Sequence, residues 1–385
     1  MLSIPNYKEA LTQAAKEFET AHKDIKVKLT FAEVAAMQTT LRTQLTAGTA
    51  PDIFSAWPGN GTVASMEVLA PGGFLMDLSG LELDKNLPSG MDLVTKMDGK
   101  RYILPLTTGA IGMIYNEQAV EAASAKLPTT WSEVLGFCDA AKAAGKVAFA
   151  YGAQTGWQNQ LINYALTATL VYGENPEFDA EQRAGKATFS DSGWKTALEK
   201  LVEMQDRGCF QPAPLGTSYE TATSMVAKGD ALSTVAVSSS YAAIVAAADT
   251  STTFKMFALP ATDDASQTWI PAGGSGGYAA NAKAKNPVAA KLFLDFLASD
   301  KMQAEIGDMS GSLPAIMSDT YAVPEALTVV AEHVKAGTIH PYADQLWPSP
   351  KVSEAHISGT QQLLGGQASI ADVLKAMDAA YAAGS

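Results

Sequence analysis

A glycine-rich loop carries the residues with the most obvious catalytic potential. Residues Gly273–Gly277 match the pattern G-x-S-x-G, in which Ser275 would be the nucleophile of a secreted serine hydrolase. That motif needs a strand directly before the serine and a helix directly after it. Here Pro271 precedes the loop, and residues 277–281 have an extended pattern. The hydrolase is therefore the weakest alternative, and we expect no enzyme. The loop suits a ligand that approaches backbone N–H groups.

Metal and cofactor chemistry find no support in the residue spacing. The four histidines stand at no ligand spacing, and neither G-x-x-x-x-G-K-[ST] nor H-E-x-x-H occurs. The two cysteines, Cys138 and Cys209, are too few for a disulfide scaffold or a structural zinc site. A single bridge between them remains open, although buried free thiols are the commoner outcome. We expect no metal, no cofactor and a structural role for both cysteines.

Aromatic residues in polar loops form the pattern that recurs. Their neighbours are glycine, serine, asparagine, glutamine and proline, and the aromatic residues are Trp57, Trp157, Tyr241, Trp269 and Trp347. The C–H face of a pyranose ring stacks on an aromatic ring, and its hydroxyls need amides, carboxylates or backbone groups. Each aromatic residue alone could instead fill a small core under its loop. Five together favour a sugar-binding cleft.

Trp157 is the strongest candidate for the principal stacking platform. It follows the expected strand 147–151, and open α/β sheets bind ligands at the carboxyl ends of their strands. Gln154, Gln158 and Asn159 lie beside it and offer hydrogen bonds to hydroxyls. Packing under the loop is the alternative for this tryptophan.

The elements that would position these loops alternate between helix and strand. Apolar residues recur at helical spacing in 6–21, 36–47, 131–144, 191–206 and 287–297, and alternate or cluster as in strands at 25–31, 52–57, 101–106, 147–151, 231–237 and 255–259. Such alternation predicts α/β architecture with largely parallel sheets. No long linker divides the chain, so two domains would be joined by more than one crossing.

Composition excludes several classes of function. The chain has 385 residues and a net charge of −13, and it shows no basic stripe, so a phosphate backbone would repel it. No apolar stretch is long enough to span a membrane. The first residues show no basic segment followed by an apolar one, so we expect either a cytosolic start or a chain whose signal has been removed. We expect an acidic globular protein that binds no nucleic acid.

An ordered set of segments resembles the extracellular solute-binding proteins of carbohydrate ABC importers, the family 1 group that includes maltose-binding protein. The segments are EFETAHKDIKVKLTF, AGTAPDIFSAWPG, DGKRYILPLTTGAIGMIYN, LPTTWSEVLGFCDAAKAAG, PAGGSGGYAANAKAKNPVAAKLFLDFLAS and GSLPA. Each is weak alone, but together they span nearly all of the chain in the family's order.

The resemblance implies a two-lobed periplasmic-binding-protein fold of type II, with crossover segments that form a hinge. Crossovers are expected near residues 106–114, 252–262 and 309–314. The amino-terminal lobe would comprise 1–106 plus 262–310, and the carboxy-terminal lobe 107–261 plus 311–385. The ligand cleft would lie between them, and ligand would close the lobes.

The resemblance also transfers ligand contacts to particular positions. They are Glu33, Trp57, Gly59, Asn60, Thr108, Gly109, Gln154, Trp157, Tyr241, Trp269, Gly273, Gly274 and Trp347. The family normally begins with a strand before its first helix, whereas only Met1–Pro5 precede it here. Either the chain has been shortened or the first strand is degenerate. A slot in the amino-terminal sheet is a possible consequence.

Family membership implies a receptor that hands a sugar to the permease subunits of an importer. A di- or oligosaccharide fits the several aromatic platforms better than a monosaccharide. The protein would be a monomer outside the cytoplasm, in the periplasm or tethered to the cell surface. The alternative within the same fold is a non-sugar solute such as a polyamine, glycerol phosphate or ferric ion, whose binding groups the loops do not supply.

Overall fold

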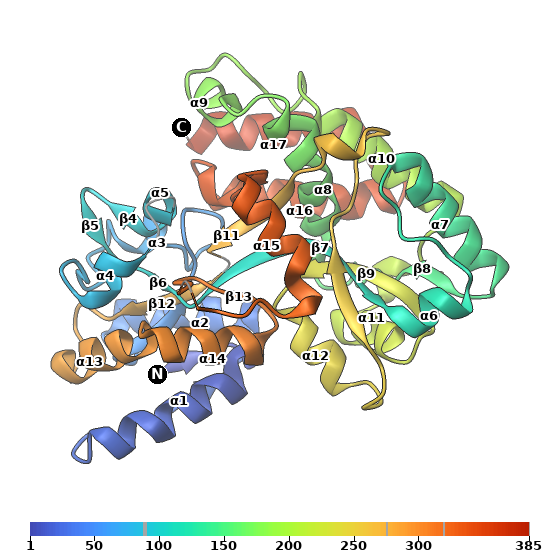
Figure 1. The fold of residues 1–385 in the computed structure, drawn as a ribbon. Helices are drawn as coiled ribbons and strands as arrows, with labels where there is room; N and C mark the ends of the chain where they lie inside the picture. The colour runs from blue at the N-terminus through green and yellow to red at the C-terminus, as the bar shows by residue number, and fades with distance from the viewer. Residues whose placement is uncertain (88–90, 275, 319, 385) are drawn as a thin grey trace. The chain divides into compact units, whose positions relative to one another are not determined.

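The computed structural model describes residues 1–87, 91–274, 276–318 and 320–384, in which helices and strands alternate (Figure 1). The chain forms two compact units. Unit 1 comprises residues 1–109, 273–322 and 344–350, and unit 2 comprises 110–272, 323–343 and 351–385. The chain thus crosses between the units after residues 109, 272, 322, 343 and 350.

These boundaries differ in part from the sequence expectation. The first crossing lies within the expected range 106–114, but the ranges 252–262 and 309–314 contain no crossing. Residues 262–272 belong to unit 2, where β11 (Ile270–Gly274) begins by pairing with β14 (Ile339–His340). Residues 311–322 belong to unit 1, because β13 (Leu313–Pro314) pairs with the start of β7 (Thr107–Asn116). Such pairings join residues far apart in sequence, which local patterns do not report.

Unit 1 contains a sheet with the strand order β2-β1-β3-β12-β6. Its strands are β1 (Leu2–Ser3), β2 (Thr30–Phe31), β3 (Ile53–Ala56), β6 (Leu104–Pro105) and β12 (Gly277–Ala280). β1 runs parallel to β2 and β3, whereas β12 runs antiparallel to β3 and β6. The sheets are therefore mixed rather than largely parallel. A strand that follows a helical crossover within one sheet runs parallel to the strand before it. The chain reaches β12 directly from unit 2, so this constraint does not apply and β12 can run antiparallel.

Alternating side chains divide the core of unit 1 into two layers. Ile53 and Tyr278 point to the face covered by α1 (Lys8–Ala21) and α13 (Pro287–Leu297), and Phe54 and Ala279 point to the face covered by α2 (Val34–Ala47). This alternation follows from the two-residue period of a strand. Figure 1 shows α1, α13 and α14 (Asp300–Ser310) side by side, in agreement with the contacts among them.

The remaining elements of unit 1 are short. They are η1 (Pro5–Tyr7), α3 (Met66–Leu69), α4 (Glu82–Asn86), α5 (Asp92–Thr95), and the hairpin strands β4 (Lys96–Met97) and β5 (Lys100–Arg101). The hairpin turns at Asp98 and Gly99, whose φ angles are +51° and +73°. These positive angles explain the Asp-Gly dipeptide.

The first strand is present but short. β1 lies between β2 and β3, and the Ser3 hydroxyl lies 2.6 Å from the Tyr278 hydroxyl. β1 has only two residues, and these pair with Thr30 and Phe31 of β2. Residues 25–29 therefore have no strand to pair with, and the strand expected over 25–31 is reduced to β2. A cavity of about 350 Å³ lies at this place, lined by Met1, Asp24–Lys28, Asp52, Ile53, Asn286, Ala289, Ala290 and Phe293. β1 itself fills the place between β2 and β3, so this cavity borders the sheet and does not replace one of its strands.

Unit 2 is built around strands β7, β8 (Val147–Phe149), β9 (Ala231–Val237) and β10 (Phe254–Phe257). β9 pairs antiparallel with β7 and parallel with β8. The helical elements are α6 (Glu117–Ala122), α7 (Trp131–Ala143), α8 (Gln158–Thr167), η3 (Ala168–Gly173), α9 (Phe178–Arg183), α10 (Trp194–Arg207), η4 (Pro214–Gly216), α11 (Tyr219–Ala227), α12 (Ser240–Ala246), η5 (Ala265–Gln267), η6 (Glu325–Leu327), α15 (Thr328–Ala336), α16 (Pro350–Leu364) and α17 (Ile370–Gly384).

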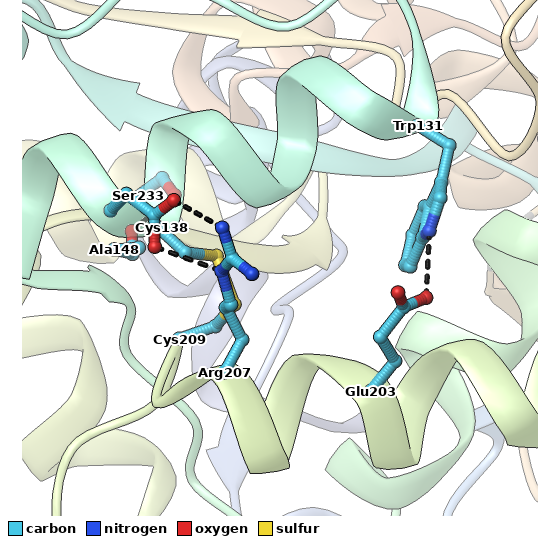
Figure 2. The surroundings of a disulfide bond; sticks show 8 residues. Trp131, Cys138, Ala148, Glu203, Arg207, Cys209 and Ser233 are labelled. Carbon is cyan, nitrogen blue, oxygen red and sulfur yellow. Dashed lines mark hydrogen bonds and ion pairs between the residues drawn. A yellow bond between two sulfur atoms is a disulfide. The ribbon is translucent and has the colours of Figure 1, made fainter.

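A disulfide joins Cys138 in α7 to Cys209, which follows the end of α10. The expectation of buried free thiols is therefore wrong, and the bridge that remained open is formed. Figure 2 shows Trp131 and Cys138 of α7 facing α10, where the Trp131 indole donates to the Glu203 carboxylate at 2.9 Å. The hydrogen bond ties the N-terminal end of α7 to α10, and the bridge ties the middle of α7 to the residue that follows Gly208.

Local sequence signals explain where these helices begin and end. Thr130 accepts a hydrogen bond from the Glu133 N–H at 3.3 Å, as the capping-box pattern predicts. α10 ends at Gly208, whose φ of +78° favours glycine. Trp131 and Trp194, expected to be packing residues, are both buried.

Candidate functional site

The loops at one edge of the unit 1 sheet carry several of the predicted site residues. β1, β2 and β3 are parallel, so the residues that follow β2 and β3 emerge at the same edge. Glu33 precedes α2 and is exposed, and Trp57 follows β3 and is partly buried. The side chain of Glu33 caps no backbone N–H of α2, which leaves its carboxylate available to solvent and ligand.

The loop after Trp57 is fixed by backbone hydrogen bonds. The Gly59 N–H donates to the Val94 carbonyl at 2.7 Å, and the Asn60 N–H donates to the Gln345 carbonyl at 3.1 Å. Gly59 has a φ of +65°, and a Cβ there would lie 2.7 Å from the Gln345 carbonyl carbon. Glycine is required at this position by both its backbone angle and its close neighbour.

Gln345 joins this loop to the glycine-rich strand end. Its side-chain amide nitrogen, Nε2, donates to the Gly274 carbonyl at 2.7 Å. Gln345 lies in η7 (Ala343–Leu346), which enters unit 1 at residue 344. Through Gln345 the structure brings together Gly59, Asn60 and Gly274. Gly273 precedes Gly274 in β11 and is partly buried. Ser275 lies outside the described residues, so the structure does not test the hydrolase hypothesis that depends on it.

Trp347 differs from the other loop tryptophans because its side chain is only 1% exposed. It ranks among the largest fully buried side chains of the described chain. The sequence pattern selected this aromatic residue and missed Gln345, two positions earlier. Gln345 lies between Asp344 and Leu346, and nothing in these neighbouring residues indicates that it contacts residues 59–60 and 274.

Thr108 and Gly109 are the last residues of unit 1 before the first crossing. Both are buried, and Thr108 pairs with Leu313 of β13. The neighbouring Thr107 hydroxyl lies 3.0 Å from the Tyr7 hydroxyl. This part of β7 is therefore held firmly within unit 1, which suits a position at the base of a hinge.

Unit 2 holds a different group of candidates, around Trp157. β8 ends at Phe149, and a loop leads to Trp157 immediately before α8. The Trp157 ring is partly buried and contacts Tyr219, with ring centroids 5.0 Å apart and an interplanar angle of 53°. Gln154 is exposed, and its N–H donates to the Thr217 carbonyl at 3.0 Å.

Tyr219 is a candidate that the sequence analysis missed. Its N–H donates to the Thr155 hydroxyl at 3.0 Å, so the segment before α11 is fastened to the loop that precedes Trp157. The signal was present, since GTSYET places an aromatic residue among glycine, serine and threonine as in the other loops. What was not visible is that residues 155–157 and 219 are neighbours.

The sequence predicts that Gln158 and Asn159 offer hydrogen bonds to the hydroxyls of a sugar. Both are buried, at 2% and 1% exposure. The Asn159 amide accepts from the Tyr151 hydroxyl at 3.1 Å and donates to the Ala153 and Gly156 carbonyls at 3.0 Å. Asn159 therefore shapes the loop under Trp157, where its hydrogen-bonding capacity is used within the protein.

Tyr241 and Trp269 contact other parts of unit 2 than Trp157 does. Tyr241 lies in the first turn of α12, where its hydroxyl donates to the Phe254 carbonyl at 3.2 Å and burial raises the pKa of that hydroxyl. The Trp269 N–H donates to the Thr169 hydroxyl at 2.9 Å, and its ring lies against Gly173. Within the described ranges, no ring contact joins either residue to Trp157.

The histidines of unit 2 contact neighbouring polar side chains. In the described part of the chain, no three His, Cys, Asp or Glu residues gather in a group that could hold a metal ion. His340 pairs with Asp179 at 2.8 Å, and His333 lies 2.7 Å from the Thr338 hydroxyl. His356 is buried beside Asn163, and this burial lowers its pKa to about 3. These histidines serve contacts within unit 2.

The family model described as bacterial extracellular solute-binding protein matches residues 4–304. A multiple sugar-binding protein of Streptococcus mutans is 26% identical over 80% of this chain and 72% of its own. A probable sugar-binding periplasmic protein of Rhizobium meliloti is 27% identical over 50% of this chain and 45% of its own, so this match spans less than half of that relative.

Solved structures share the whole fold. A chitin oligosaccharide binding protein has a TM-score of 0.82 and 23% identity, and the match covers 100% of this chain and 98% of that one. A sugar transporter from Bacillus licheniformis in complex with stachyose has a TM-score of 0.80 and 19% identity, with 100% of both chains covered. These matches confirm the two-lobed α/β fold. No helix in the described residues is long and apolar enough to cross a membrane.

Proposed function

We propose that this chain, which belongs to the family of bacterial extracellular solute-binding proteins, is the receptor of an ABC importer that captures a sugar of two or more rings. One observation carries the proposal: a relative named as a multiple sugar-binding protein aligns with 80% of the chain. The solved structures with the same fold include one titled as a complex with raffinose and one titled as a complex with stachyose. Raffinose and stachyose are both oligosaccharides.

The chemistry of the two candidate regions supports a sugar. Trp57 in unit 1 and Trp157 in unit 2 are partly exposed aromatic rings beside amides and glycine backbone. An aromatic face binds the C–H face of a pyranose, and the amides and backbone groups bind its hydroxyls. We propose that the sugar lies between the two units and that its binding closes them about the crossing segments.

The cellular setting follows from the same proposal. The Cys138–Cys209 disulfide supports a site of action outside the cytoplasm, where disulfides persist. There the receptor, a monomer, would deliver the sugar to the permease subunits and carry out no chemistry of its own. Whether it diffuses in a periplasm or is tethered to the cell surface does not alter the binding step.

A thermal-shift screen tests the function directly. The panel contains mono-, di-, tri- and tetrasaccharides with α and β linkages, together with spermidine, glycerol phosphate and ferric citrate. A ligand at one hundred times its Kd stabilises the native state by about 2.7 kcal/mol, so a true ligand raises the melting temperature measurably. We expect a shift with at least one oligosaccharide. A shift with only a non-sugar compound would refute a sugar receptor.

Small-angle scattering tests the closing movement separately. We expect a smaller radius of gyration when the panel sugar with the largest thermal shift is present at saturation. Identical scattering curves with and without that sugar would exclude closure while leaving the sugar-binding assignment intact.

A further inference from the structure

The side chain of Gln345 in unit 1 is buried, and one of its two polar atoms has no hydrogen-bond partner among the described residues. It is 4% exposed and lies in the short segment 344–350, which leaves unit 2, joins unit 1 and returns. Its backbone carbonyl accepts the Asn60 N–H at 3.1 Å. The main chain at Gln345 is therefore fixed against the loop that carries Trp57, Gly59 and Asn60.

The orientation of the Gln345 amide is set by its neighbour. Nε2 donates to the Gly274 carbonyl at 2.7 Å, and a carbonyl oxygen can only accept. Exchanging the nitrogen and oxygen of the amide would place two acceptors against each other, so the observed assignment is the stable one. The oxygen, Oε1, is thereby directed away from Gly274.

Oε1 has no hydrogen-bond partner among the described residues, and it is buried. A buried acceptor without a donor is unfavourable, and native structures satisfy nearly all of them with protein, water or ligand. A Cβ at Gly59 would meet the backbone of Gln345 and one at Gly61 the carboxylate of Asp344, so these two glycines let the segment 344–345 pack directly against the loop. The position therefore calls for a donor supplied from outside the protein.

We propose that Oε1 of Gln345 accepts a hydrogen bond from one hydroxyl group of the bound sugar and so selects for that hydroxyl. The inference rests on the proposed function and adds a specificity-determining residue to it. A ligand with a hydroxyl at the matching ring position is preferred over the same ligand with hydrogen, fluorine or a methyl ether there, because these groups have no proton to donate.

A cycle that combines one protein change with one ligand change tests this assignment. Wild type and Gln345→Met are titrated calorimetrically with the panel sugar of largest thermal shift and with its monodeoxy derivatives. We expect one deoxygenation to weaken binding to wild type by about 5- to 100-fold and to leave binding to Gln345→Met nearly unchanged. Deoxygenation at the other positions should weaken both proteins equally.

Two further variants separate hydrogen bonding to the sugar from support of the loop. Gln345→Glu keeps an acceptor but loses the donor to Gly274, so it should retain discrimination at the same hydroxyl even where its overall affinity falls. Gln44→Met changes another partly buried glutamine of unit 1, whose oxygen also lacks a partner among the described residues. It should show the wild-type pattern at every hydroxyl.

The outcomes distinguish failure of the inference from failure of the function. If a sugar binds but the effects of Gln345→Met and of every deoxygenation are additive, Gln345 only supports the loop, or a bound water satisfies Oε1, and the inference is overturned. If no sugar on the panel binds wild type, the proposed function fails first and the inference with it.

Discussion

The two candidate regions, one in each unit, would hold a sugar in different ways. In unit 1 the site is a set of fixed hydrogen bonds, in which Gln345 connects the Gly59–Asn60 loop to Gly274. In unit 2 it is a partly exposed aromatic pair, Trp157 and Tyr219, above a buried amide, Asn159. Hydrogen bonds are directional and discriminate among hydroxyls, whereas stacking is tolerant and contributes area. We infer that unit 2 provides most of the affinity and unit 1 most of the selectivity.

The two units also differ in what stabilises them. Both cysteines of the chain lie in unit 2, where they are bonded to each other. Unit 2 also contains His356, which is fully buried beside Asn163. Changes to these residues should therefore act on the stability of unit 2, whereas changes to the unit 1 loop should act on binding.

The largest expected effect is on affinity in Trp157→Ala. Truncation of a central aromatic contact costs about 2–4 kcal/mol, or roughly 30- to 1,000-fold in Kd. Because the ring is partly exposed, the melting temperature of the sugar-free protein should change little. Titration calorimetry with the panel sugar measures the loss, and Trp157→Phe should recover much of it. Normal binding by the alanine variant would show that unit 2 does not supply the main platform.

Removal of the disulfide should separate stability from affinity. The double variant Cys138→Ser, Cys209→Ser loses the constraint on the unfolded chain, which we expect to cost about 2–4 kcal/mol of unfolding free energy. Sugar affinity should stay nearly intact, since Cys138 lies in α7 and Cys209 follows α10, and neither helix carries a candidate ligand contact. Chemical denaturation and calorimetry give the two quantities. A large affinity loss in a folded double variant would contradict the division of roles.

A pair of glycine variants tests the unit 1 loop. Gly59→Ala and Gly48→Ala both place alanine at a positive φ, +65° and +69°, which costs about 1–2 kcal/mol each. Only at Gly59 does the new methyl group meet the backbone of Gln345, whereas Gly48 faces open space. We expect Gly59→Ala alone to weaken sugar binding, at least tenfold. Equal affinities in the two variants would remove the Gly59–Gln345 contact from the site.

The last prediction concerns the pH dependence of the stability of unit 2. Burial lowers the pKa of His356 from its ordinary 6.5 to about 3, so the unfolded chain binds a proton that the folded chain excludes between these values. The stability that unit 2 gains from keeping His356 neutral is fully present above pH 6.5. It is lost as the pH falls, by about 2 kcal/mol of unfolding free energy at pH 5. His356→Gln should lose less stability than wild type between pH 7 and pH 5 in urea titrations. Parallel pH profiles would assign the acid sensitivity to other groups.

Local patterns in the sequence predicted the elements better than the site. The helix that begins at Trp131 and the strand Ala231–Val237 follow from capping and alternation, which depend on neighbouring residues alone. The family resemblance then supplied the order of the elements. The strand over 25–31 failed because its length is set by a partner strand, β1, which is only two residues long.

The site residues show the same limit more sharply. Gly59 and Asn60 were predicted as ligand contacts from the resemblance, whereas their neighbour Gln345 was not, because that contact joins segments nearly three hundred residues apart. Trp347 and Asn159 were assigned to ligand from their types and loops, and both are buried. Whether a polar or aromatic side chain faces a ligand or the protein interior depends on what lies across from it, and one sequence does not encode that in any short window.

The passage of residues 344–350 through unit 1 has a consequence for biosynthesis. A ribosome makes the chain from the N-terminus, and domains generally fold as they emerge. Here the Gly59–Asn60 loop acquires its Gln345 contacts only after residue 345 has appeared, and unit 2 still awaits 351–385. Neither unit can finish folding while the other is untranslated, so the nascent chain stays incompletely folded until synthesis is nearly over. That property is compatible with threading an unfolded polypeptide through a membrane translocon before it closes into its native form.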